Sequence, residues 1–301
     1  MKNTEPKKIK KYKAGTTALY ILLHPYILLT LVSFIKTVLI DFFISQFARK
    51  LGFTKTPIAK VDNELDNKIP FNPNKVGIYM DFTAFWIRPL SMIIKRLGYK
   101  KAKPYVIAYL NKIKLTYSSA GKVYKICMST TDRPHYNKKF YFRVIHVFDP
   151  HYLCVPSLHI CVVSLVWSFY RQAFKEIEEI PQEEKDMYLQ EMYHDAIKIA
   201  ETVLYIKQHS VNCIPAALYM MTFLMKPYFT VEDGINFLND MFKSSSIPEK
   251  DLKEIRDYMY FILERLSLVG ISDDNWISPI KAWMKEYCIN ANQAYIANKI
   301  K

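Results

Sequence analysis

The stretch TTALYILLHPYILLTLVSFIKTVLIDFFISQF, residues 16–47, decides the fold of this chain. Its first apolar run ends at Ile35 and is broken only by His24-Pro25, and its second run ends at Phe47. About twenty apolar residues are enough for a helix to cross a bilayer. A signal peptide has a shorter apolar core and a small-residue cleavage site, and neither is found here. We therefore expect a membrane-inserted helix, with a buried helix of a soluble core as the alternative.

Basic residues precede this stretch. Residues 1–13 hold six lysines and one glutamate, and the 301-residue chain has a formal net charge of +14. Lysines beside a first span remain in the cytoplasm and contact anionic head groups. We expect residues 1–15 to be a basic cytoplasmic N-terminus. The excess charge points to an anionic partner, which is nucleic acid, a membrane surface or a phosphate-bearing substrate.

Further apolar segments follow, and no alternating strand pattern interrupts them. The predicted fold class is all-α, a six-helix membrane bundle over residues 16–229 with a C-terminal helical extension over residues 230–301. In the extension, helices are expected to begin after Thr230, after Pro248 and near Asp274. The segments expected in the bundle after the first are residues 77–97, 104–128, 158–170, 196–206 and 211–225.

The apolar spans define a topology for an integral protein of the cytoplasmic (inner) membrane. With the N-terminus inside, the basic run 95–103 and the acidic segment 171–195 lie inside. Residues 129–157 and 207–211 then lie on the extracytoplasmic face. The C-terminal extension ends inside.

Composition excludes several other classes of protein. The hydrophobic fraction of 50% rules out intrinsic disorder. Seven glycines, with neither a GxGxxG nor a GxxxxGK[ST] motif, argue against a glycine-rich nucleotide site. The five cysteines form no CxxC pair, so neither a zinc site nor a disulfide framework is predicted. We expect no metal and no cofactor.

Three short segments carry candidate chemistry, and the expected topology places all three at the outer face. They are Asp132-Arg133-Pro134, the VPSLH segment at 155–159, and Lys207-Gln208-His209. Histidine can attack phosphorus or protonate a leaving oxygen, and Arg and Lys stabilise the charge on a transferring phosphoryl group. The three segments therefore predict a phosphate site.

Ser157 follows a proline and precedes an apolar helix, which is typical of an N-cap. His159 then lies in the first helical turn, where backbone N–H groups and the helix dipole favour an anion. The alternative is a structural role without chemistry, because histidines at helix ends are commonly caps or hydrogen-bonded surface groups.

The PSLH segment and Lys207-Gln208-His209 resemble motifs of the type-2 phosphatidic acid phosphatase superfamily. The similar branch contains lipid phosphatases and phosphotransferases related to inositolphosphorylceramide synthases. Arg133-Pro134 is similar to the branch's first motif, and Phe148-Asp149-Pro150 and Ile69-Pro70-Phe71 are also similar. The resemblance covers residues 60–225.

By this resemblance, His209 is the nucleophile that forms a phosphohistidine, and His159 is the general acid for the leaving alcohol. Arg133 and the backbone at Ser157 hold the phosphate, and Lys207 assists. The implied activity is that of a lipid phosphatase or phosphotransferase on a phospholipid or isoprenoid phosphate, and membrane lipids are the other partners.

The chain departs from the family at the third motif. The family has Asp four residues after the nucleophilic histidine, where it orients the imidazole, and this chain has Cys213 there. Lys125 lies one residue off the usual spacing to Arg133-Pro134. A second hypothesis is therefore a catalytically impaired pseudoenzyme that binds lipid or acts as a membrane scaffold.

A third hypothesis is a soluble helical protein that binds nucleic acid through its positive charge. No recognised nucleic-acid motif accompanies that charge, so no nucleic-acid partner is expected. Extraction by high salt or carbonate without detergent would favour this third hypothesis.

Overall fold

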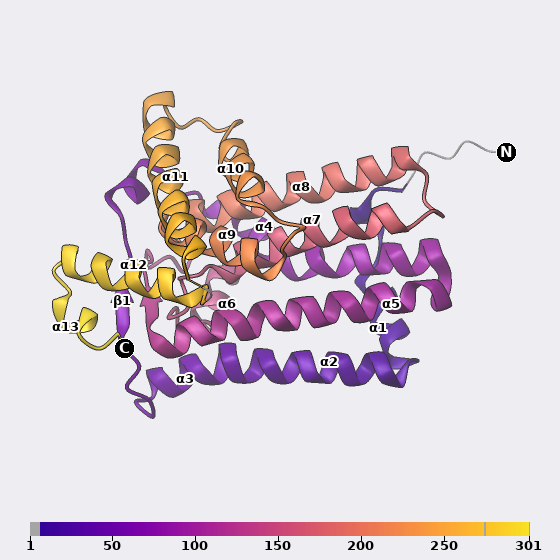
Figure 1. Ribbon diagram of the computed structural model, residues 1–301, viewed down its shortest axis with the longest axis horizontal. Helices are drawn as coiled ribbons and strands as arrows, with labels where there is room; N and C mark the ends of the chain where they lie inside the picture. The colour runs from indigo at the N-terminus through magenta and orange to yellow at the C-terminus, as the bar shows by residue number, and fades with distance from the viewer. Residues whose placement is uncertain (1–6, 274, 301) are drawn as a thin grey trace.

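Helices dominate the computed structural model, which describes residues 7–273 and 275–300 (Figure 1). The predicted all-α class is confirmed at this level. Two three-residue strands were not expected: β1 (Ile58–Lys60) pairs in parallel with β2 (Met128–Thr130). Strands this short give no alternating pattern in the sequence, and their pairing depends on residues about 70 positions apart.

The apolar N-terminal stretch forms one side of the bundle (Figure 1). After η1 (Ile9–Lys11), the chain forms α1 (Ala14–Leu22) and then a continuous helical run through α2 (Pro25–Thr37), the π-helical η2 (Val38–Ile44) and α3 (Ser45–Lys50). The break at His24-Pro25 falls between α1 and α2, where Pro25 takes the first helical position.

The run Pro25–Lys50 is the single candidate membrane span among the described residues. Its 26 residues correspond to about 39 Å of helix, more than the roughly 30 Å of a bilayer core. Only 11% of its most apolar window is buried. Large apolar side chains are exposed along it, namely Tyr26, Leu29, Val32, Ile35, Leu39, Ile40 and Ile44. A core helix of a soluble protein would have covered this face.

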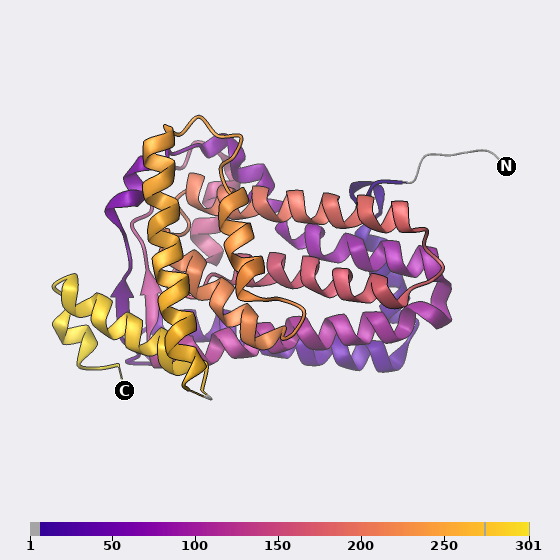
Figure 2. The ribbon, with the colours of Figure 1, turned by 45° about the horizontal axis from the view of Figure 1, so that its top comes forward.

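The next 45 residues form α5 (Phe82–Ile126), which reverses direction at Gly98. Gly98 has φ 73° and ψ 172°, a conformation that a side chain disfavours. The two halves lie side by side (Figures 1 and 2). The turn falls inside the basic run 95–103 that was expected to form a loop.

The fifth expected segment is longer than predicted. The structure joins residues 196–206 to the preceding acidic segment in one 24-residue helix, α8 (Gln182–Tyr205). This helix packs along α7 (Leu158–Glu176). Its first half also receives the N-terminal segment, because the Glu191 carboxylate accepts the backbone N–H groups of Ile9 and Lys10 at 2.9 and 3.0 Å. The acidic segment, expected as a loop or a helix, is helical, but the expected boundary between it and a short apolar span at residues 196–206 is not found.

The C-terminal extension lies at the opposite end of the bundle from the N-terminal segment (Figures 1 and 2). The expectation that it returns to the N-terminal side is therefore wrong. The reason is the length of α9 (Cys213–Leu224), whose 12 residues give only about 18 Å of helix. The extension consists of α10 (Val231–Asp240), α11 (Glu249–Ile271), α12 (Ile277–Asn290) and α13 (Ala294–Ala297).

Two of the predicted helix starts are confirmed: α10 begins after its N-cap Thr230, and α11 begins after Pro248. The third was expected near Asp274, which lies outside the described residues, and α12 begins at Ile277. Residue 230 marks a helix start but not the edge of a separate core, because α9 packs on both α10 and α11. The remaining elements are η3 (Glu64–Lys68), η4 (Pro73–Lys75), α4 (Val76–Met80) and α6 (Phe140–Phe148).

The packing of η2 on α5 can be tested at Gly121. A Cβ atom there would lie 2.8 Å from the Cβ of Asp41, closer than real Cβ contacts allow. Gly121→Ala should therefore lower the free energy of unfolding by about 1–3 kcal/mol. Gly77→Ala is the matched control, since its Cβ would meet nothing within 4 Å. Thermal unfolding in detergent measures both, and equal stability of the two variants would refute this packing.

Candidate functional site

The loop before α7, the loop before α9 and the segment after β2 meet at one place. The two loops, together with α6 and the start of α5, surround a cavity of about 270 Å³ near the end of the α2–α3 run. His159 and His209, predicted from separate segments, both line it. Apolar side chains form much of the rest of the wall, namely Phe42, Phe43, Phe82, Leu153, Leu158 and Phe148.

The two predicted catalytic histidines face each other. Their ring centroids lie 5.5 Å apart, with the rings at 69°. The His159 ring also packs against Tyr79 and Phe82, with centroids at 4.6 and 4.5 Å. Burial and the neighbouring His159 hold the pKa of His209 well below its usual range, so His209 is neutral. A neutral imidazole keeps a lone pair available for attack.

Ser157 holds the N-cap position of α7, as predicted, but its side chain does not cap the helix. Its hydroxyl lies 3.2 Å from Nε2 of His209. Its backbone N–H donates to the carbonyl of Cys213 at 3.3 Å, so the predicted phosphate contact from this N–H is wrong. The N–H groups of residues 158–160 have no carbonyl partner within the helix, and they are the ones placed to receive an anion.

Position 213 supplies no carboxylate to His209. The Cys213 sulfur accepts the backbone N–H of Ser210 at 3.4 Å. Nδ1 of His209 is buried and has no hydrogen-bond partner among the described residues. The atom that an orienting Asp would contact in a triad is therefore unpaired.

Arg133 reaches the site but lies behind the cavity wall. Its guanidinium donates to Oε1 of Gln208 at 3.1 Å and to the carbonyl of Asp149 at 3.0 Å. It also pairs with the Asp149 carboxylate at 3.7 Å. Gln208 and Asp149 line the cavity themselves, so Arg133 holds two residues of the cavity wall in place.

Lys207 does not line the cavity, contrary to the prediction that it assists in holding the phosphate. Its ammonium donates to the backbone carbonyls of Asp66 and Ile69, the latter at 2.5 Å. Lys207 has a positive backbone φ of 56°. Burial lowers its pKa, with the Asp66 charge opposing that shift. Its function is to anchor the loop before α9.

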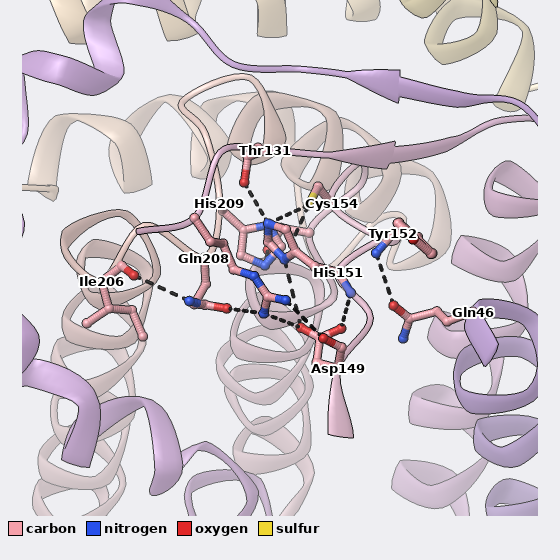
Figure 3. Close-up of polar contacts among 11 residues, drawn as sticks. Gln46, Thr131, Asp149, His151, Tyr152, Cys154, Ile206, Gln208 and His209 are labelled. Atoms are coloured by element: carbon pink, nitrogen blue, oxygen red, sulfur yellow. Dashed lines mark hydrogen bonds and ion pairs between the residues drawn. The ribbon is translucent and has the colours of Figure 1, made fainter. Parts of the chain in front are cut away.

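A second polar cluster at the cavity was missed from the sequence. His151 Nε2 lies 2.7 Å from the Thr131 hydroxyl and 3.7 Å from the Cys154 sulfur, and its Nδ1 lies 3.9 Å from the Asp149 carboxylate (Figure 3). The density of polar residues in DPHYLC, residues 149–154, directly before the PSLH motif, was the signal that could have identified it.

These groups hold charge in a buried place. Burial opposes ionisation of Asp149, yet its hydrogen bond with His151 and the charges of His151 and Arg133 lower its pKa to about 2. Burial by itself would lower the pKa of His151, but the neighbouring Cys154 and the nearby Asp149 carboxylate raise it to about 9. Asp149 and His151 are therefore an ion pair at neutral pH.

The loop that carries this cluster is held on two sides. Ser129 of β2 receives the N–H of Cys154 on its carbonyl at 3.2 Å and the N–H of Val155 on its hydroxyl at 2.7 Å. Gln46 of α3, fully buried, accepts the N–H of Tyr152 at 3.1 Å (Figure 3). The apolar N-terminal run and the site are thus directly connected.

In the described part of the chain, no group of three His, Cys, Asp or Glu side chains is arranged to hold a metal ion. No family model, no curated protein and no solved structure matches this chain.

The Asp149–His151 pair predicts a pH dependence of stability. The raised pKa of His151 stabilises the fold fully below the unfolded value of about 6.5, and this stabilisation is lost as pH rises through about 9. The loss should be about 3 kcal/mol. His151→Asn, which tolerates the positive φ of 68°, should remove most of it. Denaturant unfolding between pH 6 and pH 10 measures the slope, and an unchanged slope in the variant would contradict the assignment.

Proposed function

We propose that this protein is a membrane-bound lipid phosphatase or phosphotransferase that works through a phosphohistidine. The observation that carries the proposal is the pair His159 and His209, 5.5 Å apart in one cavity. The start of α7 lies beside them, and its free N–H groups are suited to a phosphate. The resemblance of PSLH and Lys207-Gln208-His209 to the type-2 phosphatidic acid phosphatase motifs supports the same chemistry.

The reaction follows from these positions. Nε2 of His209 attacks phosphorus, and the bond from phosphorus to the leaving oxygen breaks. Burial lowers the pKa of His159 to about 4, so His159 has to take up a proton before this step. It then gives that proton to the leaving oxygen and releases the alcohol. Water or a second alcohol, deprotonated by His159, then attacks the phosphohistidine and returns His209 to its starting state. Water makes the protein a phosphoric monoester hydrolase, and an alcohol makes it a phospho-alcohol transferase.

The surroundings of the cavity support a lipid as substrate. Phe42 and Phe43 belong to the exposed apolar run Pro25–Lys50 and also line the cavity. A phospholipid or isoprenoid phosphate has an anionic head for the histidines and an apolar tail for this wall. We propose that this run anchors the chain in the cytoplasmic membrane, with the site at the extracytoplasmic face.

We propose that fewer than six helices of the bundle face lipid. Of the described helices, α8 carries acidic residues through its first half, and residues 104–126 of α5 carry four lysines, namely Lys112, Lys114, Lys122 and Lys125. Charged side chains facing lipid are costly. We propose that the α2–α3 run meets lipid directly and that the other helices pack on its protein side.

The nucleophile is tested with His209→Gln. Detergent-purified protein should release phosphate from a panel of lipid phosphates, with inhibition by vanadate, and the variant should lose at least about a thousandfold in rate. His194→Gln, an exposed histidine on α8, is the control and should keep wild-type activity. Equal activity of wild type and His209→Gln would remove His209 from the mechanism.

The unpaired Nδ1 of His209 favours a second candidate, an impaired member of this fold that binds lipid phosphates without turnover. Cys213→Asp tests it, because a carboxylate there would accept the Nδ1 proton. If the second candidate holds, the wild type should be inactive and Cys213→Asp should raise turnover at least about tenfold. Cys213→Ser is the control for the loss of the thiol, and thermal unfolding checks that both variants fold. Rapid wild-type turnover would contradict the second candidate.

A further inference from the structure

Helix α6, FYFRVIHVF, is amphipathic, and its outer face is apolar. Four large side chains are exposed on it: Phe140 is 65% exposed, Tyr141 46%, Val147 64% and Phe148 62%. An exposed group of this kind within nine residues is unusual for a surface in contact with water alone. Something apolar is therefore expected to cover α6.

The inner face of α6 is packed and joins the cavity. Phe142 and Ile145 are buried against Val76 and Ile206. Ile145 and Phe148 also line the cavity that holds His159 and His209. Because the inner face is fixed, the exposed apolar face belongs to the folded structure and is not the result of a detached segment.

Basic side chains accompany the exposed apolar face. Lys138 and Arg143 are exposed beside it, and the Arg143 guanidinium lies 5.8 Å from the centre of the Phe140 ring. No Asp or Glu occurs between residues 133 and 148. An apolar face with a basic rim is complementary to the head-group region of an anionic bilayer. A partner protein would more commonly offer acidic residues to such a rim, and neither Lys138 nor Arg143 forms an ion pair within the described residues.

The lipid-compatible run Pro25–Lys50 continues this surface. Phe42 and Phe43 of η2 line the same cavity as Ile145 and Phe148 of α6. The cavity therefore has an exposed apolar helix on each of two sides. Because both helices line the same cavity, a bilayer that covers the η2 side lies close to α6.

We infer that α6 lies in the outer head-group region of an anionic membrane and sets the mouth of the cavity at that depth. The inference rests on the membrane location under the proposed function, but not on the phosphatase chemistry. A substrate would then enter from the bilayer with its head at the level of the histidines, without leaving the lipid.

Site-specific labelling tests this inference in the full chain. The five native cysteines are buried, so a cysteine introduced at an exposed position reacts first. Val147→Cys, carrying an environment-sensitive fluorophore, is reconstituted in phosphatidylcholine vesicles containing phosphatidylglycerol. A head-group-proximal doxyl lipid should quench it at least about twofold more than it quenches Lys250→Cys, an exposed position on α11. Soluble iodide should show the reverse order.

Two further variants distinguish a failure of this inference from a failure of the proposed function. Leu29→Cys, on the exposed face of α2, reports whether the membrane location holds. Lipid quenching at Leu29 but not at Val147 would overturn the inference and leave the proposed function intact, whereas quenching at neither would overturn both. Lys138→Gln combined with Arg143→Gln should reduce quenching of the Val147 label by about half in anionic vesicles. Protection of that label from iodide without lipid quenching would indicate a protein partner and overturn the inference.

Discussion

The position of the site depends on a set of hydrogen bonds that Lys207 and Asp66 form in the loop before α9. The ammonium of Lys207 is bound to the carbonyls of Asp66 and Ile69, and the carboxylate of Asp66 accepts the N–H of Val211 at 2.8 Å. Both charges are largely removed from water, so each requires its partner. Together they fix the loop on both sides of His209. The position of the candidate nucleophile therefore follows from an anchor that makes no contact with the cavity.

A second constraint is the hydrogen bonding of the two ring nitrogens of His209. The Ser157 hydroxyl can donate to Nε2 of His209, while the buried Nδ1 makes no hydrogen bond of good geometry within the described part of the chain. A buried polar atom without a partner is costly, and the rest of the structure has to offset that cost. The positive charges of His151 and Arg133 are instead paired with Asp149, which lines the same cavity. The carboxylate at this site, that of Asp149, therefore pairs with His151 and Arg133 and does not orient the candidate nucleophile His209.

Local signals in the sequence were sufficient for part of this structure. Thr230 caps α10 as expected, and His159 and His209 come together from segments fifty residues apart. The continuity of α8 was not predictable from hydropathy, because its acidic half is stabilised by packing on α7 and by the contact of Glu191 with the N-terminal segment. The anchoring function of Lys207 was likewise hidden, since a lysine beside a histidine gives no indication of where its ammonium points.

The short length of α9 has a further consequence. Because α9 does not return the chain along the bundle, the C-terminal helices remain at the end that holds the cavity, and the N-terminal segment remains at the other (Figure 2). An apolar slab that covers the run Pro25–Lys50 would separate these two ends. A reporter domain fused behind α13 would then share a compartment with the cavity, and one fused before η1 would lie across the barrier from it.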